Sequence, residues 1–248
     1  MRAPINNYQN QQLNNSPPIP TSLLLVYASE TGTTAAMADA VAAGIRSVDD
    51  VHLDVVRLRD GTECDPELAR RCDGIVLGTP VRHRNMHHAV KRFVEEVLER
   101  LWLTDDMVGA TGGVFTVGGG HGDVGAGAEL CQLGLLATLA ANGLVLVSHP
   151  KTTPGFDHAG GHWGPAGRTG GPKMEPLELS DAMRSAGHHH GANVARVARA
   201  LAPQRGSLLA RGNVSPSEEV ATAFASGEFD RAAPPEGFVS GAAAGLTA

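Results

Sequence analysis

Hydrophobic and polar positions along the chain alternate in blocks that predict strands and helices in turn. Residues 23–27 are apolar throughout, a run too short for an independent helix and typical of a parallel strand buried on both faces. Residues 74–79 have the same character. Residues 51–58 instead alternate apolar and polar side chains, which predicts an edge strand with one exposed face. The other predicted strands are residues 108–117 and 144–147.

The segments between these strands carry apolar residues at helical spacing. The predicted helices are residues 35–47, 65–71, 87–102, 129–142 and 177–201. Gly143 is expected to end the fourth of them, and Gly187 is a point where the last could break. Strands and helices that alternate with right-handed crossovers predict an α/β fold with a doubly wound parallel sheet.

The ends of the chain differ in composition from its middle. Residues 1–21, rich in Asn, Gln and Pro, predict a flexible tail, and residues 203–248, rich in Ala, Gly and Pro, predict a second tail with at most a short helix near 216–226. Residues 22–202 are then the folded domain. Within it, the Gly- and Pro-rich residues 148–176 are long for a structureless loop, which indicates either a functional loop or an element not recognised.

The turn after the first strand carries side chains that suit an anion. Its hydroxyls belong to Ser29, Thr31, Thr33 and Thr34, and Gly32 lets the backbone turn or approach a ligand closely. The free N–H groups at the start of the following helix would add donors for a phosphate. The alternative is an ordinary helix N-cap, since Ser and Thr are favoured there in any case.

Two segments resemble known loops. Ser29-Glu30-Thr31-Gly32-Thr33-Thr34 resembles the FMN-phosphate loop of flavodoxin-like proteins, S/T-x-T-G-x-T. Residues 74–86, G-I-V-L-G-T-P-V-R-H-R-N-M, resemble the G-T-P-x-R-x-x-N-M loop of the NAD(P)H:quinone oxidoreductases of the tryptophan-repressor-binding-protein (WrbA) type, and this longer match is the more specific. The resemblance covers about residues 22–200 and implies a flavodoxin-like sheet of five parallel strands in the order 2-1-3-4-5, with helices on both faces.

The resemblance also implies which residues bind FMN. The phosphate would contact Ser29, Glu30, Thr31, Gly32, Thr33 and Thr34. The isoalloxazine would lie beside Thr79, Pro80, Val81, Arg82, His83 and Asn85, with its edge against Val117, Gly118, Gly119, Gly120, His121 and Gly122. Asn142 falls where the family often has a His near the flavin, and Trp102 matches an aromatic residue that lines the nicotinamide or quinone pocket. Trp102 could equally be a core residue that closes a helix. No catalytic side chain is expected, because the flavin carries the chemistry.

Three positions depart from the family pattern. Thr31 stands where these reductases usually have a Tyr near the nucleotide, His83 and Arg84 replace an aromatic-Gly pair, and the glycine loop lacks the Ser-Thr-Gly-Thr run. The nicotinamide contact and the backbone of the second loop are therefore expected to differ from those of the family.

Two other kinds of site have less support. Gly120, Gly122 and Gly125 match G-x-G-x-x-G, but residues 130–156 hold no Asp or Glu to bind the ribose of a dinucleotide. Histidines cluster at 87–88, 158–162 and 188–190, yet none of these groups has a full set of metal ligands, so no metal is expected.

Composition limits the partners and the compartment. A net charge of -6 with 20 Lys and Arg gives no basic face for nucleic acid. The three cysteines are expected to be reduced, no apolar run is long enough for a membrane span, and the first 20 residues lack the apolar core of a signal peptide. These features favour the cytoplasm.

The resemblance and the residues lead to one main functional hypothesis. It is an FMN-dependent NAD(P)H:quinone oxidoreductase that passes two electrons to a quinone or similar small acceptor by a ping-pong mechanism, and the family implies a homodimer or homotetramer. Two alternatives stay open, namely a flavodoxin-type electron carrier without its own NAD(P)H turnover and a flavodoxin-like scaffold that has lost FMN.

Overall fold

One parallel sheet forms the centre of the fold in the computed structural model, which describes residues 20–120, 125–173 and 175–209. The strands are β1 (Thr21–Ala28), β2 (Val51–Leu58), β3 (Gly74–Pro80), β4 (Thr111–Gly118), β5 (Val145–Leu146) and β6 (Ala166–Arg168). Their order is β2-β1-β3-β4-β5, with β6 also paired to β4. The predicted order 2-1-3-4-5 is therefore confirmed, and β2 lies at an edge as expected.

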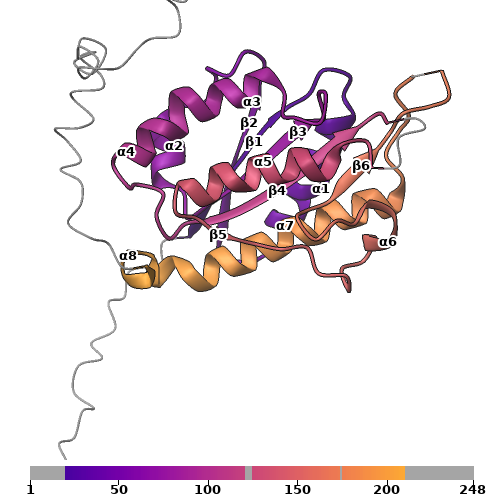
Figure 1. Cartoon of the computed structure of the whole chain (residues 1–248). Helices are drawn as coiled ribbons and strands as arrows, with labels where there is room; N and C mark the ends of the chain where they lie inside the picture. The colour runs from indigo at the N-terminus through magenta and orange to yellow at the C-terminus, as the bar shows by residue number, and fades with distance from the viewer. Residues whose placement is uncertain (1–19, 121–124, 174, 210–248) are drawn as a thin grey trace, which may run out of the picture.

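Helices cover both faces of the sheet, as predicted (Figure 1). The helices are α1 (Thr33–Arg46), α2 (Pro66–Arg71), α3 (His88–Phe93), the π-helical η1 (Val94–Leu98), α4 (Glu99–Leu103), α5 (Ala128–Ala141), α6 (Phe156–Ala159), α7 (Asp181–Leu201), the 3-10 turn η2 (Ala202–Gln204) and α8 (Arg205–Leu208). One face packs against α1 and α7, and the other packs against α2, α5 and the helix that runs from α3 through α4.

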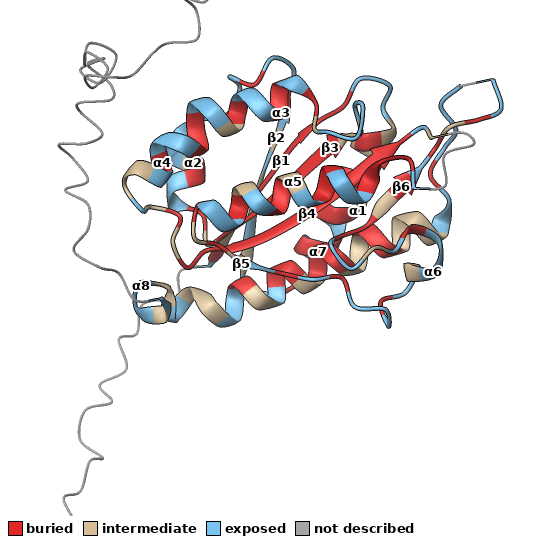
Figure 2. Ribbon diagram, viewed as in Figure 1, coloured by how far each residue is buried: buried red, intermediate tan, exposed pale blue. Residues whose placement is uncertain are grey.

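Successive residues of β1 belong to different hydrophobic layers. Leu24 and Val26 pack in the layer under α2, α3 and α5, whereas Leu23 and Leu25 pack in the layer under α1 and α7. All four side chains are fully buried. Figure 2 shows the consequence, because the central strands and the helix sides that face them are coloured as buried. A strand buried on both faces explains why residues 23–27 carry no polar side chain.

Helices α1 and α7 pack closely through glycines. Gly187 allows this approach, since a Cβ there would lie 2.6 Å from the sulfur of Met37, and a Cβ on Gly191 would overlap the carbonyl oxygen of Val41. The suggestion that α7 breaks at Gly187 was wrong, because the helix continues through it to Leu201. Gly187 therefore allows α1 and α7 to pack closely and does not interrupt α7.

Within the described residues, the sheet contains the five predicted strands and one short strand more, β6, which the sequence did not predict. Strand β5 pairs only with Thr111 and Gly112 of β4, which leaves the later part of that β4 edge open. The three residues of β6 pair there, from Thr116 to Gly118. Residues 148–176 therefore hold a short strand and α6 instead of being wholly irregular.

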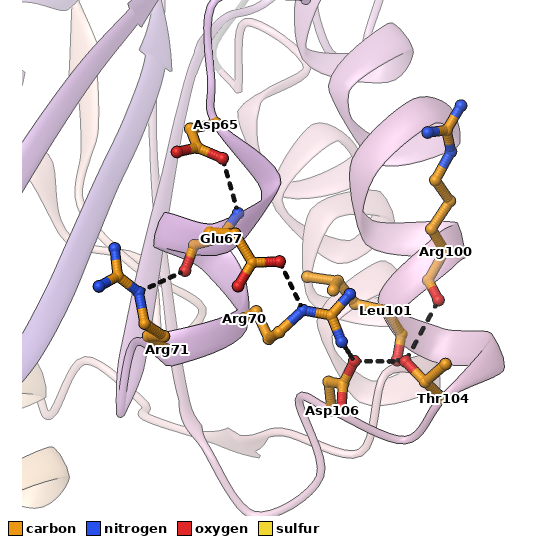
Figure 3. Close-up of polar contacts among 8 residues, drawn as sticks. All are labelled: Asp65, Glu67, Arg70, Arg71, Arg100, Leu101, Thr104 and Asp106. Atoms are coloured by element: carbon orange, nitrogen blue, oxygen red, sulfur yellow. Dashed lines mark hydrogen bonds and ion pairs between the residues drawn. The ribbon is translucent and has the colours of Figure 1, made fainter. Parts of the chain in front are cut away.

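The end of the sheet where β3 and β4 begin is closed by polar contacts between α2 and the turn after α4 (Figure 3). Asp65 accepts a hydrogen bond from the Glu67 N–H at 3.0 Å and so caps α2. Arg70 binds Glu67 at 3.0 Å and also pairs with Asp106, which Thr104 contacts in turn. These charges satisfy one another, and they lie at the end of the sheet opposite the two loops that resemble flavin-binding segments.

The cysteines are free and buried. Burial raises the pKa of Cys64 to about 11 and the pKa values of Cys72 and Cys131 to about 12. The three thiols are therefore protonated at neutral pH and poor nucleophiles. In the described part of the chain, no helix has both the length and the apolar character needed to cross a bilayer.

Candidate functional site

Two adjoining cavities lie where the carboxyl ends of β1, β3 and β4 meet. The first, here called the loop pocket, has a volume of about 190 Å³ and lies between the loops after these three strands and the residues Thr169, Gly170, Glu175 and Pro176. The second, the helix pocket, has a volume of about 270 Å³ and lies between the start of α1 and the segment that leads into α7. Thr31, Thr33 and Pro176 line both, so the two pockets are neighbours. The carboxyl end of the strands is where open α/β sheets bind ligands.

The turn at residues 29–34 leaves backbone donors free at the start of α1. Ser29 is buried, and its Oγ accepts a hydrogen bond from the Ala35 N–H at 3.1 Å, while the Ala36 N–H donates to the Gly32 carbonyl. Gly32 caps α1 with φ of +92° and no side-chain hydrogen bond. Within the described residues, the N–H groups of Thr33 and Thr34 then have no acceptor. The turn is thus partly capped by Ser29 and still offers donors to an anion.

Glu30 joins the loop after β1 to the loop after β3. Its carboxylate accepts a hydrogen bond from His87 Nε2 at 3.1 Å and forms an ion pair with Arg82. On the other side of the turn, Arg57 of β2 donates from Nη2 to the carbonyl oxygen of Ser29 at 2.6 Å. These contacts fix the position of the turn. The Glu30 carboxylate binds His87 and Arg82 of the same chain.

His87 is a positioning residue that the sequence analysis missed. Its backbone N–H donates to Thr79 Oγ1 at 2.8 Å, and its Nδ1 accepts from the Ala89 N–H at 3.2 Å. Burial, with His88 and Arg82 nearby, lowers the pKa of His87. A neutral ring with its proton on Nε2 satisfies all of these contacts, because Nδ1 accepts and Nε2 donates to Glu30.

The loop after β3 makes a tight turn at residues 82–85. Arg82 and Asn85 exchange backbone hydrogen bonds of 2.8 and 2.9 Å, and His83 and Arg84 between them have positive φ of 48° and 66°. Two central residues at positive φ are typical of a type I′ turn, which usually contains Asn or Gly. His83 and Asn85 are exposed on this turn and do not line the loop pocket, whereas Pro80, Val81 and Arg82 do.

The glycine loop after β4 is held by the segment that follows β6. The N–H groups of Thr169 and Gly170 donate to the carbonyl oxygens of Gly118 and Gly119, both at 3.0 Å. Gly119 has open space on its Cβ side, with the nearest atom at 3.9 Å. Val117, Gly118 and Gly119 line the loop pocket. Gly120 follows them with positive φ, and the predicted site residues His121 and Gly122 lie outside the described residues.

Two predicted site residues lie elsewhere. Asn142 caps the far end of α5, about 20 Å along the helix from Ala128. Trp102 is half exposed and lines a separate cavity of about 300 Å³ together with Asn142 and Lys91. The structure therefore does not bring these two side chains to the loop pocket of the same chain.

A polar cavity of about 620 Å³ lies beside the loop after β3. It combines one carboxylate with a guanidinium, two imidazoles and an ammonium group, which belong to Glu30, Arg82, His87, His88 and Lys91. The cavity connects this loop to the groove between α3 and α5.

One cation near the phosphate-like turn comes from an element far away in the sequence. Arg184, in the first turns of α7, lines the helix pocket together with Gly32 and Thr33. Glu178 also lines this pocket, and its side chain is exposed. No local pattern around the turn indicated this arginine, because about 150 residues separate the two.

The histidine clusters form no metal centre in the described residues, where no group of three or more potential ligands converges. His149 and His190 stack in the interior, with ring centroids 5.3 Å apart and planes 9° apart. No ring nitrogen of either has a hydrogen-bond partner. Burial is the main cause that lowers their pKa values, to about 4 for His149 and about 3 for His190. Both rings are therefore neutral at pH 7.

Comparison with known proteins identifies relatives of the same architecture. The model of the flavodoxin domain matches residues 24–114. The chain is 30% identical to an NAD(P)H dehydrogenase (quinone) of Solidesulfovibrio magneticus, over 68% of this chain and 95% of that one, and 30% identical to one of Syntrophobacter fumaroxidans, over 72% and 98%. Among solved structures, the flavodoxin WrbA-like protein of Agrobacterium tumefaciens aligns with a TM-score of 0.56 at 20% identity, over 73% of this chain and 99% of that one.

Proposed function

Because this chain belongs to the flavodoxin-like family of NAD(P)H dehydrogenases (quinone), we propose that it is an FMN-dependent oxidoreductase that transfers two electrons from NAD(P)H to a quinone. The observation that carries this proposal is the meeting of the phosphate-like turn, the Pro80 loop and the glycine loop at two adjoining pockets. The match to relatives over nearly their whole length supports an activity of the same class.

The residues fit a flavin mononucleotide at both of its ends. The free N–H groups of Thr33 and Thr34 suit the phosphate, and Gly32 has no atom within 4 Å of its Cβ position. At the other end, Pro80, Val81 and Val117 present apolar surface to a flat ring. Each pocket alone is smaller than the ~300–1,000 Å³ typical of ligand sites, so the ligand would extend through both.

The protein's part in the reaction is to hold and orient the cofactor. When bound, FMN supplies the redox chemistry, since it can accept a hydride from the nicotinamide and pass two electrons to a quinone. Gly118 and Gly119 let the backbone approach the ring edge closely, because no side chain intervenes. Thr169, Gly170, Glu175 and Pro176 line the loop pocket and would limit the access of water to the ring.

We further propose that nucleotide and quinone use one face of the cofactor in turn, which is a ping-pong mechanism. Pro80, Val81 and Val117 would wall the flavin ring on one side, which would leave one ring face for the nicotinamide and the quinone to occupy one after the other. Initial-rate measurements at several quinone concentrations would then give parallel lines in double-reciprocal plots. Intersecting lines would contradict the ping-pong mechanism and leave the proposed overall reaction in place.

One experiment separates this function from its alternatives. The purified full chain is loaded with flavin, its spectrum is recorded, and NADPH or NADH is added without oxygen, followed by benzoquinone. We expect the absorbance near the flavin maximum to bleach with the nucleotide and return with the quinone. Chromatography of the cofactor released from the protein as purified, before loading, should identify FMN. Bound flavin that responds to neither nucleotide would indicate an electron carrier, and a chain that takes up no flavin would indicate a scaffold.

A further inference from the structure

The helix pocket gathers positive charge from two helices that begin beside it. The N-cap Gly32 and the first residue of α1, Thr33, line it on one side, and Leu179 and Arg184, around the start of α7, line it on the other. Both helix N-termini carry partial positive charge. The side chain of Arg184 adds a full charge, because a guanidinium stays protonated at any physiological pH.

Arg184 stands at a position that its own helix does not favour. A cation in the first turns of a helix meets the positive end of the helix dipole, so an acidic or neutral residue would suit α7 better. Ser180 and Asp181 follow that preference, since Ser180 Oγ accepts from the Met183 N–H at 3.2 Å and Asp181 occupies the first turn. The helix dipole of α7 therefore does not explain an arginine at position 184, and its role lies in a contact outside this helix.

The charge of Arg184 is not satisfied within the described part of the chain, where its guanidinium makes no ion pair or hydrogen bond. The other arginines beside the turn already have partners, since Arg57 donates to the carbonyl oxygen of Ser29 and Arg82 pairs with Glu30. Glu178, the acidic residue that lines the same pocket, is exposed and forms no ion pair with Arg184. Among the described residues that line it, the helix pocket thus has free N–H donors and one cation without a partner, Arg184.

We propose that Arg184 binds the terminal phosphate of the flavin mononucleotide and makes the site select the phosphorylated flavin over riboflavin. This inference rests on the proposed function, because it uses the same site. The neutral donors of the turn would bind a phosphate oxygen, and the guanidinium would offset one of the two negative charges of the phosphate. The residue that discriminates between the two flavins would then come from α7 and not from the turn that resembles the family's phosphate loop.

The test is a comparison of two flavins with one variant. Apoprotein prepared from the full chain is titrated with FMN and with riboflavin, and the dissociation constants are read from the quenching of flavin fluorescence. In Arg184→Gln we expect the dissociation constant for FMN to rise about tenfold or more, as for loss of a charged hydrogen bond, and that for riboflavin to stay within about twofold. Arg184→Lys keeps the charge and should lose less. Arg196→Gln is the matched control, since Arg196 lies on the same helix and bonds to Asn193.

Ionic strength gives a second measurement that a merely structural role would not change. Salt screens a partly exposed ion pair, so FMN binding by the unaltered protein should weaken as salt rises, and this dependence should be smaller in Arg184→Gln. Equal weakening of both flavins in the variant would show that Arg184 supports the fold instead. Unchanged FMN affinity would show that it does not touch the phosphate. If the unaltered protein binds neither flavin, the proposed function fails, and this inference fails with it.

Discussion

At the scale of single residues, Thr33 is the position on which the cofactor proposal depends most directly. It lines both the loop pocket and the helix pocket, and its N–H is one of the two free donors at the start of α1. Its side chain is partly exposed, whereas that of the neighbouring Thr34 is buried. A substitution at Thr33 therefore changes the site with little effect on the hydrophobic core.

We predict that Thr33→Glu weakens FMN binding by about 3 kcal/mol, because a carboxylate at the free donors repels the phosphate and fills its space. Riboflavin binding should fall much less. The check is a fluorescence titration with both flavins, with Thr152→Glu, on an exposed part of the chain, as the control for added charge. An FMN affinity equal to that of the unaltered protein would place the phosphate away from this turn.

The residues of the site divide into those that the sequence could predict and those that it could not. The turn at 29–34 and residues 79–82 were recognisable because each is a local motif. Thr31 and Thr33 of the turn line both pockets, and residues 80–82 line the loop pocket. His87, Arg57 and Arg184 were missed because each acts through a partner distant in the sequence, such as Glu30 for His87. Trp102 and Asn142 were assigned from family positions, and in this chain they lie at a separate cavity.

At the scale of elements, the predictions were most accurate where one segment carries the whole signal. Residues 51–58 alternate apolar and polar side chains, and β2 has these same bounds. Strand β6 had no such signal, since Ala-Gly-Arg has no hydrophobic pattern and pairs only because β5 leaves the end of the β4 edge free. The sequence around Gly187 also does not distinguish a helix break from a helix contact. Only the packing of α7 against Met37 shows that a glycine is required for close approach.

The glycines between α1 and α7 lead to a stability prediction. A Cβ at Gly191 would overlap the carbonyl oxygen of Val41, which is backbone and cannot rotate away. We expect Gly191→Ala to lower the free energy of unfolding by about 3 kcal/mol, since the two helices must move apart.

Urea unfolding followed by circular dichroism measures this change. Gly206→Ala is the matched control, because Gly206 lies in a helix with no atom within 4 Å of its Cβ position. There the substitution should be neutral or should stabilise the protein by up to about 1 kcal/mol, since alanine has the higher helix propensity. Equal effects of the two substitutions would mean that α1 and α7 do not pack closely.

At the scale of the whole molecule, one stacked pair of rings connects the long segment after β5 to α7. His149 lies in that segment, His190 lies in α7, and both are buried against each other. His162 and His189 lie near His149 and oppose a positive charge on it. The contact between these two parts of the chain therefore requires that both rings be neutral.

This requirement predicts how stability depends on pH. Burial lowers the folded-state pKa values of His149 and His190 to about 4 and about 3, below the ordinary value of 6.5 that applies in the unfolded chain. Between these limits the unfolded state binds more protons than the folded state. The contribution of the two histidines to stability is therefore fully present above pH 6.5 and is lost as the pH falls toward 3. Each histidine contributes a slope of at most about 1.4 kcal/mol per pH unit in that window.

We expect the urea midpoint of the unaltered protein to decline from pH 7 to pH 4.5. The midpoint of His190→Gln should decline less steeply, because this variant lacks one of the two groups that take up a proton on unfolding. The comparison of slopes removes the contribution of carboxylates, which both proteins share. His52→Gln is the control, because His52 is largely exposed and should leave the slope unchanged. If His190→Gln and the unaltered protein lose stability in parallel, the buried pair does not govern acid sensitivity, and the segment after β5 is held to α7 by its apolar contacts instead.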